Sequence, residues 1–224
     1  HNLETSISST IVENTSSSEG PCINCHSFAN NSPDKMSMHI RKGNNGTVIF
    51  DNGKFEKYNT KTGNMIGPAA FTAWHPNGEL IAFSNNSIFV YFTSNVDRLV
   101  EVSDLASNIV LYNVKTNTFT TTPQISGECR ENLPNWAPNG KTLYYIRTTK
   151  SGKGQSNLVN AKYDLLSIPF DSESMSWGVA DTLIRSQDTG MSITWPAISP
   201  DGKYILFCMI DYGYFSIFDT NSDL

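Results

Sequence analysis

A recurring hairpin signature restricts the folds that are open to this chain. Three segments each read as an apolar strand, a Pro-Asn-Gly or Pro-Asp-Gly turn and a second apolar strand: 71–83, 133–145 and 195–207. Proline presets φ in such a turn, glycine tolerates positive φ, and aromatic and β-branched residues favour the flanking strands. The turn prolines Pro76, Pro138 and Pro200 are spaced 62 residues apart. Equal spacing over three copies indicates a repeated structural unit.

A second repeated phrase, a short apolar strand that runs into a polar turn, follows each hairpin. Its copies are residues 57–64, 111–118, 167–174 and 216–223. A weaker hairpin without the glycine surrounds Pro33, so four units are expected in all. Hairpin, strand, turn and last strand make a four-stranded antiparallel sheet, and periodic repetition of such sheets is typical of a β-propeller. The competing interpretation is a single β-sandwich with similar turns.

The hairpin Ser-Pro-Asp-Gly followed by Tyr-Ile-Leu-Phe, at 199–207, resembles the Pro-Asp-Gly repeat of TolB-like propellers. The resemblance covers residues 21–224. It implies an all-β, six-bladed propeller of which this chain holds about four blades. The repeat is specific for the fold and says little about function, because propellers host many unrelated activities.

Composition narrows the range of partners and suggests a two-part organisation. The net charge of −5 gives no basis for attracting a polyanion, so we expect no nucleic-acid partner. Residues 1–20 are rich in Ser, Thr, Glu and Asn, which predicts a flexible polar tether before a propeller domain at 21–224. Such leaders are common in exported and lipid-anchored proteins, and an anchor upstream of this sequence is therefore a further expectation.

The propeller segment begins with a Cys-x-x-Cys-His motif formed by Cys22, Cys25 and His26. This spacing is typical of c-type haem attachment, in which both thiols bind the porphyrin covalently and the adjacent imidazole ligates the iron. A disulfide, a thioredoxin-like redox pair and half of a zinc site are the alternatives. A zinc site would need further ligands, and a thioredoxin-like site would need a βαβ context. A disulfide would not need the adjacent histidine. The motif thus predicts covalent haem c.

The strand that follows carries further residues of the types that ligate haem iron. Antiparallel pairing around Pro33 would return residues 38–40 alongside 27–29, so Met38 and His39 are candidates for the sixth iron ligand. Met36 is a weaker candidate. The alternatives are core filling for the methionines and a satisfied polar contact for His39.

Other polar and aromatic residues favour structural roles. His75 immediately precedes a repeat turn, where turn capping competes with a ligand role at one mouth of the channel. Residues 85–107 form an insertion between blade strands, and we expect its carboxylates Asp97, Glu101 and Asp104 to be solvated. Three tryptophans near the inner-strand ends favour blade packing over an aromatic ligand platform: Trp74, Trp136 and Trp195.

Two functional hypotheses remain. The first is an exported cytochrome-like propeller that carries one haem for electron transfer with a redox partner protein. The second is a non-enzymatic TolB-like scaffold that binds a protein or glycan at the cell envelope. Both place the chain in the periplasm or elsewhere outside the cytoplasm. Haem is attached to paired cysteines there, and the leader rich in Ser and Thr fits an exported chain. No nucleophile elbow and no His-Glu-x-x-His occur in the sequence, which favours a binding or electron-transfer protein over an enzyme.

Overall fold

The computed structural model describes an all-β chain. It covers residues 4–8, 10, 22–41, 45–60, 65–67, 69–94, 96–148 and 160–223, so most of the predicted tether lies outside the described residues. Only short helical turns interrupt the strands, and none of the helices in the described ranges is long and apolar enough to cross a membrane.

Four antiparallel sheets follow one another along the chain. The first contains β1 (Cys22–Phe28), β2 (Lys35–Arg41), β3 (Gly46–Asp51) and β4 (Lys54–Tyr58). The second contains β5 (Ala69–Trp74), β6 (Leu80–Phe92), β7 (Val100–Asn113) and β8 (Thr118–Thr120). The third contains β9 (Glu131–Trp136), β10 (Thr142–Thr148), β11 (Tyr163–Asp171), β12 (Ser176–Trp177) and β13 (Asp181–Ile184). The fourth contains β14 (Ser192–Ile198) and β15 (Ile205–Ile210). The remaining elements are helix α1 (Ser186–Thr189) and the 3₁₀ turns Ala29–Asn31 and Ser216–Phe218.

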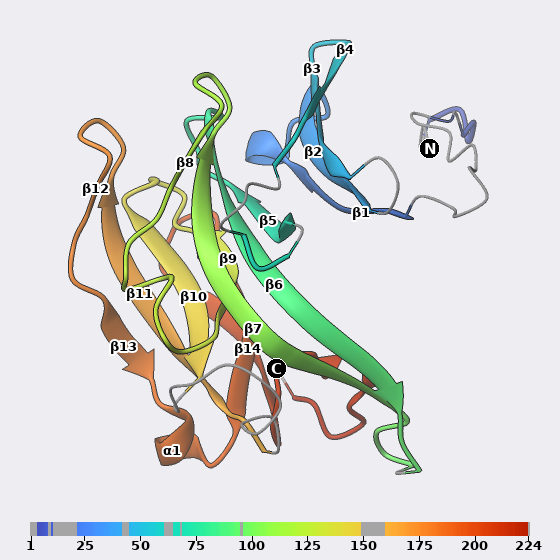
Figure 1. Cartoon of the computed structure of the whole chain (residues 1–224), viewed down its shortest axis with the longest axis vertical. Coiled ribbons are helices and arrows are strands. Elements are labelled where there is room, and N and C mark those ends of the chain that lie inside the picture. The colour runs from blue at the N-terminus through green and yellow to red at the C-terminus, as the bar shows by residue number, and fades with distance from the viewer. Residues whose placement is uncertain are drawn as a thin grey trace.

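The sheets are arranged as successive propeller blades (Figure 1). The first strand of each sheet is its innermost one, and contacts run in series from β1 to β5, from β5 to β9 and from β9 to β14. Over the described residues the four sheets form an arc rather than a closed ring. The predicted all-β propeller of antiparallel four-stranded blades is therefore confirmed, and a sandwich of two packed sheets is not what forms.

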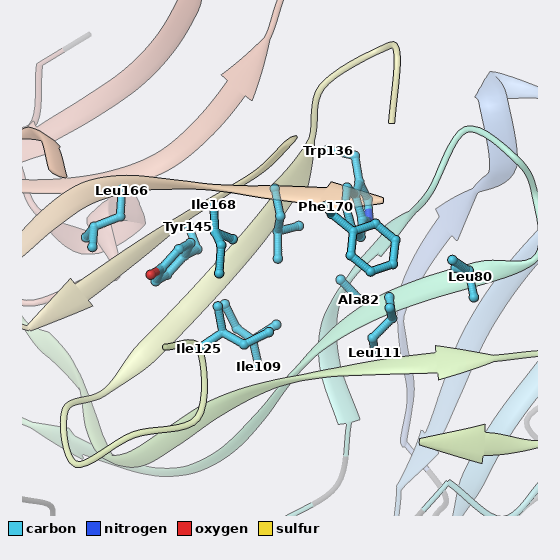
Figure 2. Packing of buried hydrophobic residues seen from close by; sticks show 11 residues of the cluster. Leu80, Ala82, Ile109, Leu111, Ile125, Trp136, Tyr145, Leu166, Ile168 and Phe170 are labelled. Carbon is cyan, nitrogen blue, oxygen red and sulfur yellow. The ribbon is translucent and has the colours of Figure 1, made fainter. Parts of the chain in front are cut away.

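Apolar side chains between neighbouring blades hold the arc together. Successive residues of a strand point to opposite faces, so β6 serves two cores at once. Leu80 and Ala82 join the cluster between the second and third blades, whereas Ile81 and Phe83 join the cluster between the first and second. Figure 2 shows the larger cluster, in which Trp136 and Phe170 of the third blade lie opposite Leu111 of the second. A blade buried on both faces has its position fixed by its neighbours.

The three proline turns are equivalent, as their spacing predicted. In each turn the glycine N–H donates to the carbonyl three residues earlier, at 2.8–2.9 Å, and the glycines Gly78, Gly140 and Gly202 have φ of 70–72°. His75 caps its own turn by accepting from the Asn77 N–H at 3.1 Å. Its Nε2 also donates to the Gly140 carbonyl at 2.9 Å, so His75 is buried between two blades and the turn-capping interpretation holds.

Two expectations about local structure are corrected. The short strand predicted at the start of 216–223 is instead a 3₁₀ turn at Ser216–Phe218. The chain that follows contacts the insertion, since the Thr220 N–H donates to the Asp97 carbonyl at 3.3 Å. The insertion 85–107 lengthens the hairpin of β6 and β7, which extends beyond the rest of its blade (Figure 1). The sequence also predicts an insertion at 148–165, most of which lies outside the described residues.

Replacing Gly140 by alanine should destabilise the fold more than the same change in the sister turns. All three glycines adopt positive φ, so the backbone penalty of an added Cβ is shared. At Gly140 the Cβ would also overlap the His75 ring, whereas at Gly202 its nearest neighbour is Pro138 Cδ at 3.9 Å. Urea denaturation should therefore show Gly140→Ala less stable than Gly202→Ala by about 1–3 kcal/mol, the usual range for overpacking. Equal losses would show that the His75 contact contributes nothing.

Candidate functional site

Every innermost strand contains a β-bulge at the same place. In β1, β5, β9 and β14 two residues oppose one residue of the partner strand. The first residue of each bulge has a left-handed backbone, with φ between 44° and 53°: Cys25, Phe71, Leu133 and Trp195. Non-glycine residues rarely adopt this conformation, and bulges often redirect side chains next to functional sites. The fourfold recurrence marks the bulges as a built feature of the fold.

The four bulges meet at one cavity. Its volume is about 430 Å³, and the bulge pairs of all four blades, together with Asn135, line it. The bulge pairs are Cys25-His26, Phe71-Thr72, Leu133-Pro134 and Trp195-Pro196. A concave, mainly apolar cavity with a few polar groups is the usual form of a ligand site. We call it the axial cavity.

Trp195 differs from the other predicted packing tryptophans. Trp74 and Trp136 are buried between blades, as expected, whereas Trp195 is 37% exposed and lines the axial cavity. Its ring makes edge-to-face contacts with Phe71 and Phe215, at centroid distances of 5.4 and 5.8 Å. Within the repeat Trp195 occupies the position of Phe71 and Leu133, 62 residues apart, and not that of Trp74. That shared offset is the sequence signal that could have identified this site.

The structure brings two members of the Cys-x-x-Cys-His motif to the axial cavity. Cys25 and His26 form the bulge of β1; the Arg41 guanidinium lies 3.6 Å from the Cys25 thiol, and the exposed His26 ring packs edge-on against Phe28. Cys22 begins β1, but its side chain lies outside the described part of the chain. The thiol and imidazole available for a covalent cofactor therefore face the cavity that all four blades share.

His39 is the centre of a hydrogen-bond chain that ends at this bulge. Its Nδ1 lies 2.8 Å from Thr47 Oγ1 and its Nε2 lies 3.0 Å from Thr72 Oγ1. The Thr72 hydroxyl donates to the Cys25 carbonyl at 3.5 Å, so Nε2 is assigned as the protonated nitrogen that donates to Thr72. Burial, with a smaller contribution from Arg41, lowers the pKa of His39 to about 4. A neutral His39 thus connects the first blade to the second and positions a cavity residue.

The candidate sixth iron ligands lie away from the axial cavity. Met36 and Met38 are buried in a cluster with Val48, on the face of β2 opposite to that of His39. Both ring nitrogens of His39 are already hydrogen-bonded. Binding of iron by Met38 or His39 would therefore require these contacts to break.

The carboxylates of the insertion are not uniformly solvated, and the prediction is wrong for two of the three. Asp97 is exposed, but Glu101 and Asp104 are 7% and 3% exposed. The Tyr212 hydroxyl donates to Glu101 at 2.6 Å across a large sequence separation, and the Ser107 hydroxyl donates to Asp104 at 2.6 Å. Tyr212 follows β15, so the burial of Glu101 depends on a contact with a distant part of the chain, which the sequence of the insertion does not reveal.

Fold and cavity together define an all-β propeller with a concave site at its inner strands. The sequence matches no protein-family model and no curated protein.

Among solved structures, the chain is similar to a protein described as TolB from Agrobacterium tumefaciens, with 13% identity and a TM-score of 0.51 over 84% of this chain and 54% of that one. It is also similar to a luciferin-regenerating enzyme, with 10% identity and a TM-score of 0.51 over 81% and 53% of the two chains. TolB from Acinetobacter baumannii gives 14% identity and a TM-score of 0.49, covering 84% of this chain and 38% of that one.

The two similarities with a TM-score of 0.51 show a propeller fold, TolB-like in the first case, and nothing beyond the fold. The chain spans about half the length of the first of these structures. A scaffold shared by proteins with such different names does not specify an activity.

The low pKa of His39 should make stability fall as the solution becomes acidic. The unfolded chain binds a proton at His39 with a pKa near 6.5, whereas the folded chain does so only near pH 4. Between these values the unfolded state binds more protons, so stability is lost as pH falls from 6.5 towards 4. The difference in the pKa of His39 between the unfolded and the folded state corresponds to about 3 kcal/mol in the free energy of unfolding.

Urea denaturation at pH 7, 5.5 and 4 should show this loss, and His39→Gln should reduce its pH dependence. Direct observation by NMR of a folded-state His39 titration above pH 6 would contradict the assignment.

Proposed function

We propose that this chain is the binding propeller of a protein located outside the cytoplasm and that the axial cavity is its ligand site. The observation that carries the proposal is that four bulges, one from each blade, line a single cavity with their side chains. Because the innermost strands all face the centre of the arc, the bulges bring residues of four blades to one space, where a single ligand can contact all of them. The TolB-like fold supports an envelope location and a partner there.

The lining indicates the chemistry of the ligand. Phe71, Leu133 and Trp195 supply apolar and aromatic surface, while Thr72 and Asn135 supply polar groups that can fix the orientation of a bound segment. Aromatic residues with accessible faces often form the energetic centre of a protein interface. An apolar side chain of an envelope protein, inserted between these residues, is the ligand that the cavity suits best; a glycan stacked on Trp195 is the alternative.

Trp195 provides the direct test of this proposal. A photo-crosslinking amino acid placed at position 195 should capture an envelope partner, whereas the same residue at Tyr204, which is 72% exposed in the same blade, should not. Trp195→Ala should weaken the interaction at least tenfold, as expected for loss of a central aromatic contact, and Tyr204→Ala should leave it unchanged. Equal crosslinking at both positions would reject the axial cavity as the binding site.

Covalent haem is a second candidate, favoured by one observation: Cys25 and His26 both line the axial cavity. Cys22 and Cys25 would hold the porphyrin and His26 would ligate the iron, with Met38 or His39 as sixth ligand only after the rearrangement described above. Bound haem would supply one-electron transfer with a redox partner protein. A site at the channel would leave one haem edge accessible to that partner, whose surface we expect to be basic because this chain is acidic.

Mass spectrometry decides the haem hypothesis. Protein produced in a host able to attach haem should carry the added mass of the cofactor and show a Soret band, and Cys22→Ser with Cys25→Ser should abolish both. His26→Ala should alter the spin state and leave the thioether bonds possible. A mass equal to that of the bare polypeptide would exclude haem and leave the binding propeller unaffected.

A further inference from the structure

A second cavity lies between the insertion hairpin and the segment that follows β15. Its volume is about 140 Å³, and its lining includes Tyr91, Glu101, Asp104, Tyr163 and Tyr214. It shares no lining residue with the axial cavity. A water molecule occupies about 30 Å³ of liquid, so the space admits a small organic group and not only a single ion.

Asp104 contributes a buried, incompletely satisfied carboxylate to this cavity. Its Oδ2 accepts hydrogen bonds from Ser107 at 2.6 Å, Tyr163 at 3.0 Å and Asn132 at 3.2 Å. Its Oδ1 is buried and has no hydrogen-bond partner, although the residue is only 3% exposed. Unpaired buried oxygens of this kind are rare, because desolvation without a partner is costly.

Tyr214 presents a second buried oxygen without a partner. Its hydroxyl makes no hydrogen bond, and the residue is 1% exposed. The position of Tyr214 is fixed, because its ring packs against the Tyr163 and Phe71 rings and its backbone carbonyl accepts a hydrogen bond from the Thr194 hydroxyl. Two residues that line one small cavity therefore each carry a buried oxygen without a hydrogen-bond partner.

The charges around the cavity leave Asp104 without a full counter-ion. Arg98 is shared by Glu101, at 3.3 Å, and Asp219, at 3.8 Å, and it also stacks on the Tyr212 ring at 3.9 Å. Asp104 makes no salt bridge within the described residues, and Arg130 acts on it only at longer range. Burial raises the pKa of Asp104, which shows that Arg130 does not offset the desolvation of this carboxylate.

We propose that this cavity binds a small alkylammonium ion, with the cationic head on Asp104 Oδ1 and Tyr214 Oη. The aromatic rings around it attract an organic cation, and the negative charge of Asp104 is compensated when the cation enters. A metal ion fits less well, because no group of three or more acidic, His or Cys side chains is placed to hold one in the part of the chain described. Anions are disfavoured by Glu101 and Asp104 in the wall.

Calorimetric titration with n-propylammonium chloride tests the proposal directly. Binding of propylammonium should saturate, whereas 1-propanol, which has the same shape and no charge, should not bind. Nα-acetyl-lysine amide, whose side-chain amine is free, should bind if the natural source of the amine is a lysine side chain. Asp104→Asn keeps the shape of the residue and should weaken propylammonium binding at least tenfold, because a charge-assisted interaction is lost. Tyr214→Phe removes only the second oxygen and should also weaken it.

The matched control is Asp97→Asn, which removes the same charge from an exposed position in the same insertion. It should leave binding unchanged, and thermal unfolding should show that all three variants are folded. The proposal is overturned if 1-propanol binds as well as the amine, or if Asp104→Asn and Tyr214→Phe both bind as the parent protein does. Saturable, Asp104-dependent binding of calcium chloride in place of the amine would overturn it as well.

Discussion

The left-handed bulge in each innermost strand is the constraint on which the arrangement of the sites depends. A non-glycine residue in this conformation costs about 1–2 kcal/mol, so four of them persist only where surrounding contacts hold them. Those contacts cross between blades: the Trp74 indole N–H donates to the Ser27 carbonyl at 3.1 Å, and the Leu133 N–H donates to the Ser84 hydroxyl at 3.0 Å. Interblade packing thus stabilises the strained backbone that lines the axial cavity.

The blades could be predicted from sequence because their determinants are local. A proline turn with apolar flanks specifies a hairpin by itself, and the 62-residue spacing of Pro76, Pro138 and Pro200 then specifies repetition. The bulges could not be predicted in the same way. The 62-residue spacing makes Phe71, Leu133 and Trp195 equivalent, but these residues and Cys25 share no type that would indicate a bulge. Register is decided by pairing with the next strand, which a residue pattern with mixed chemistry does not encode.

The buried carboxylates are a second feature that could not be predicted from the sequence, because their burial depends on residues far along the chain. Glu101 and Asp104 lie in an insertion whose composition suggests a solvated surface, and exposed Asp97 conforms to it. Glu101 accepts a hydrogen bond from Tyr212, which follows β15, and Asp104 accepts from Asn132 and Tyr163 of the third blade. The segment predicted as strand and turn at 216–223 likewise contains a 3₁₀ turn, and its Thr220 N–H donates to the Asp97 carbonyl of the insertion. Periodicity within a unit cannot reveal contacts made between units.

The position of the Cys-x-x-Cys-His motif connects the two candidate functions physically. Its Cys25 and His26 occupy the bulge, so any group attached there would enter the space that Phe71, Leu133 and Trp195 also line. A haem attached at Cys25 and a partner side chain inserted beside Trp195 would both use the space that these residues line. The two therefore compete if both occur, and loading with haem would exclude the partner from the axial cavity. Cys25 and His26 are therefore the residues through which the two proposals can be separated, because only haem attachment requires them.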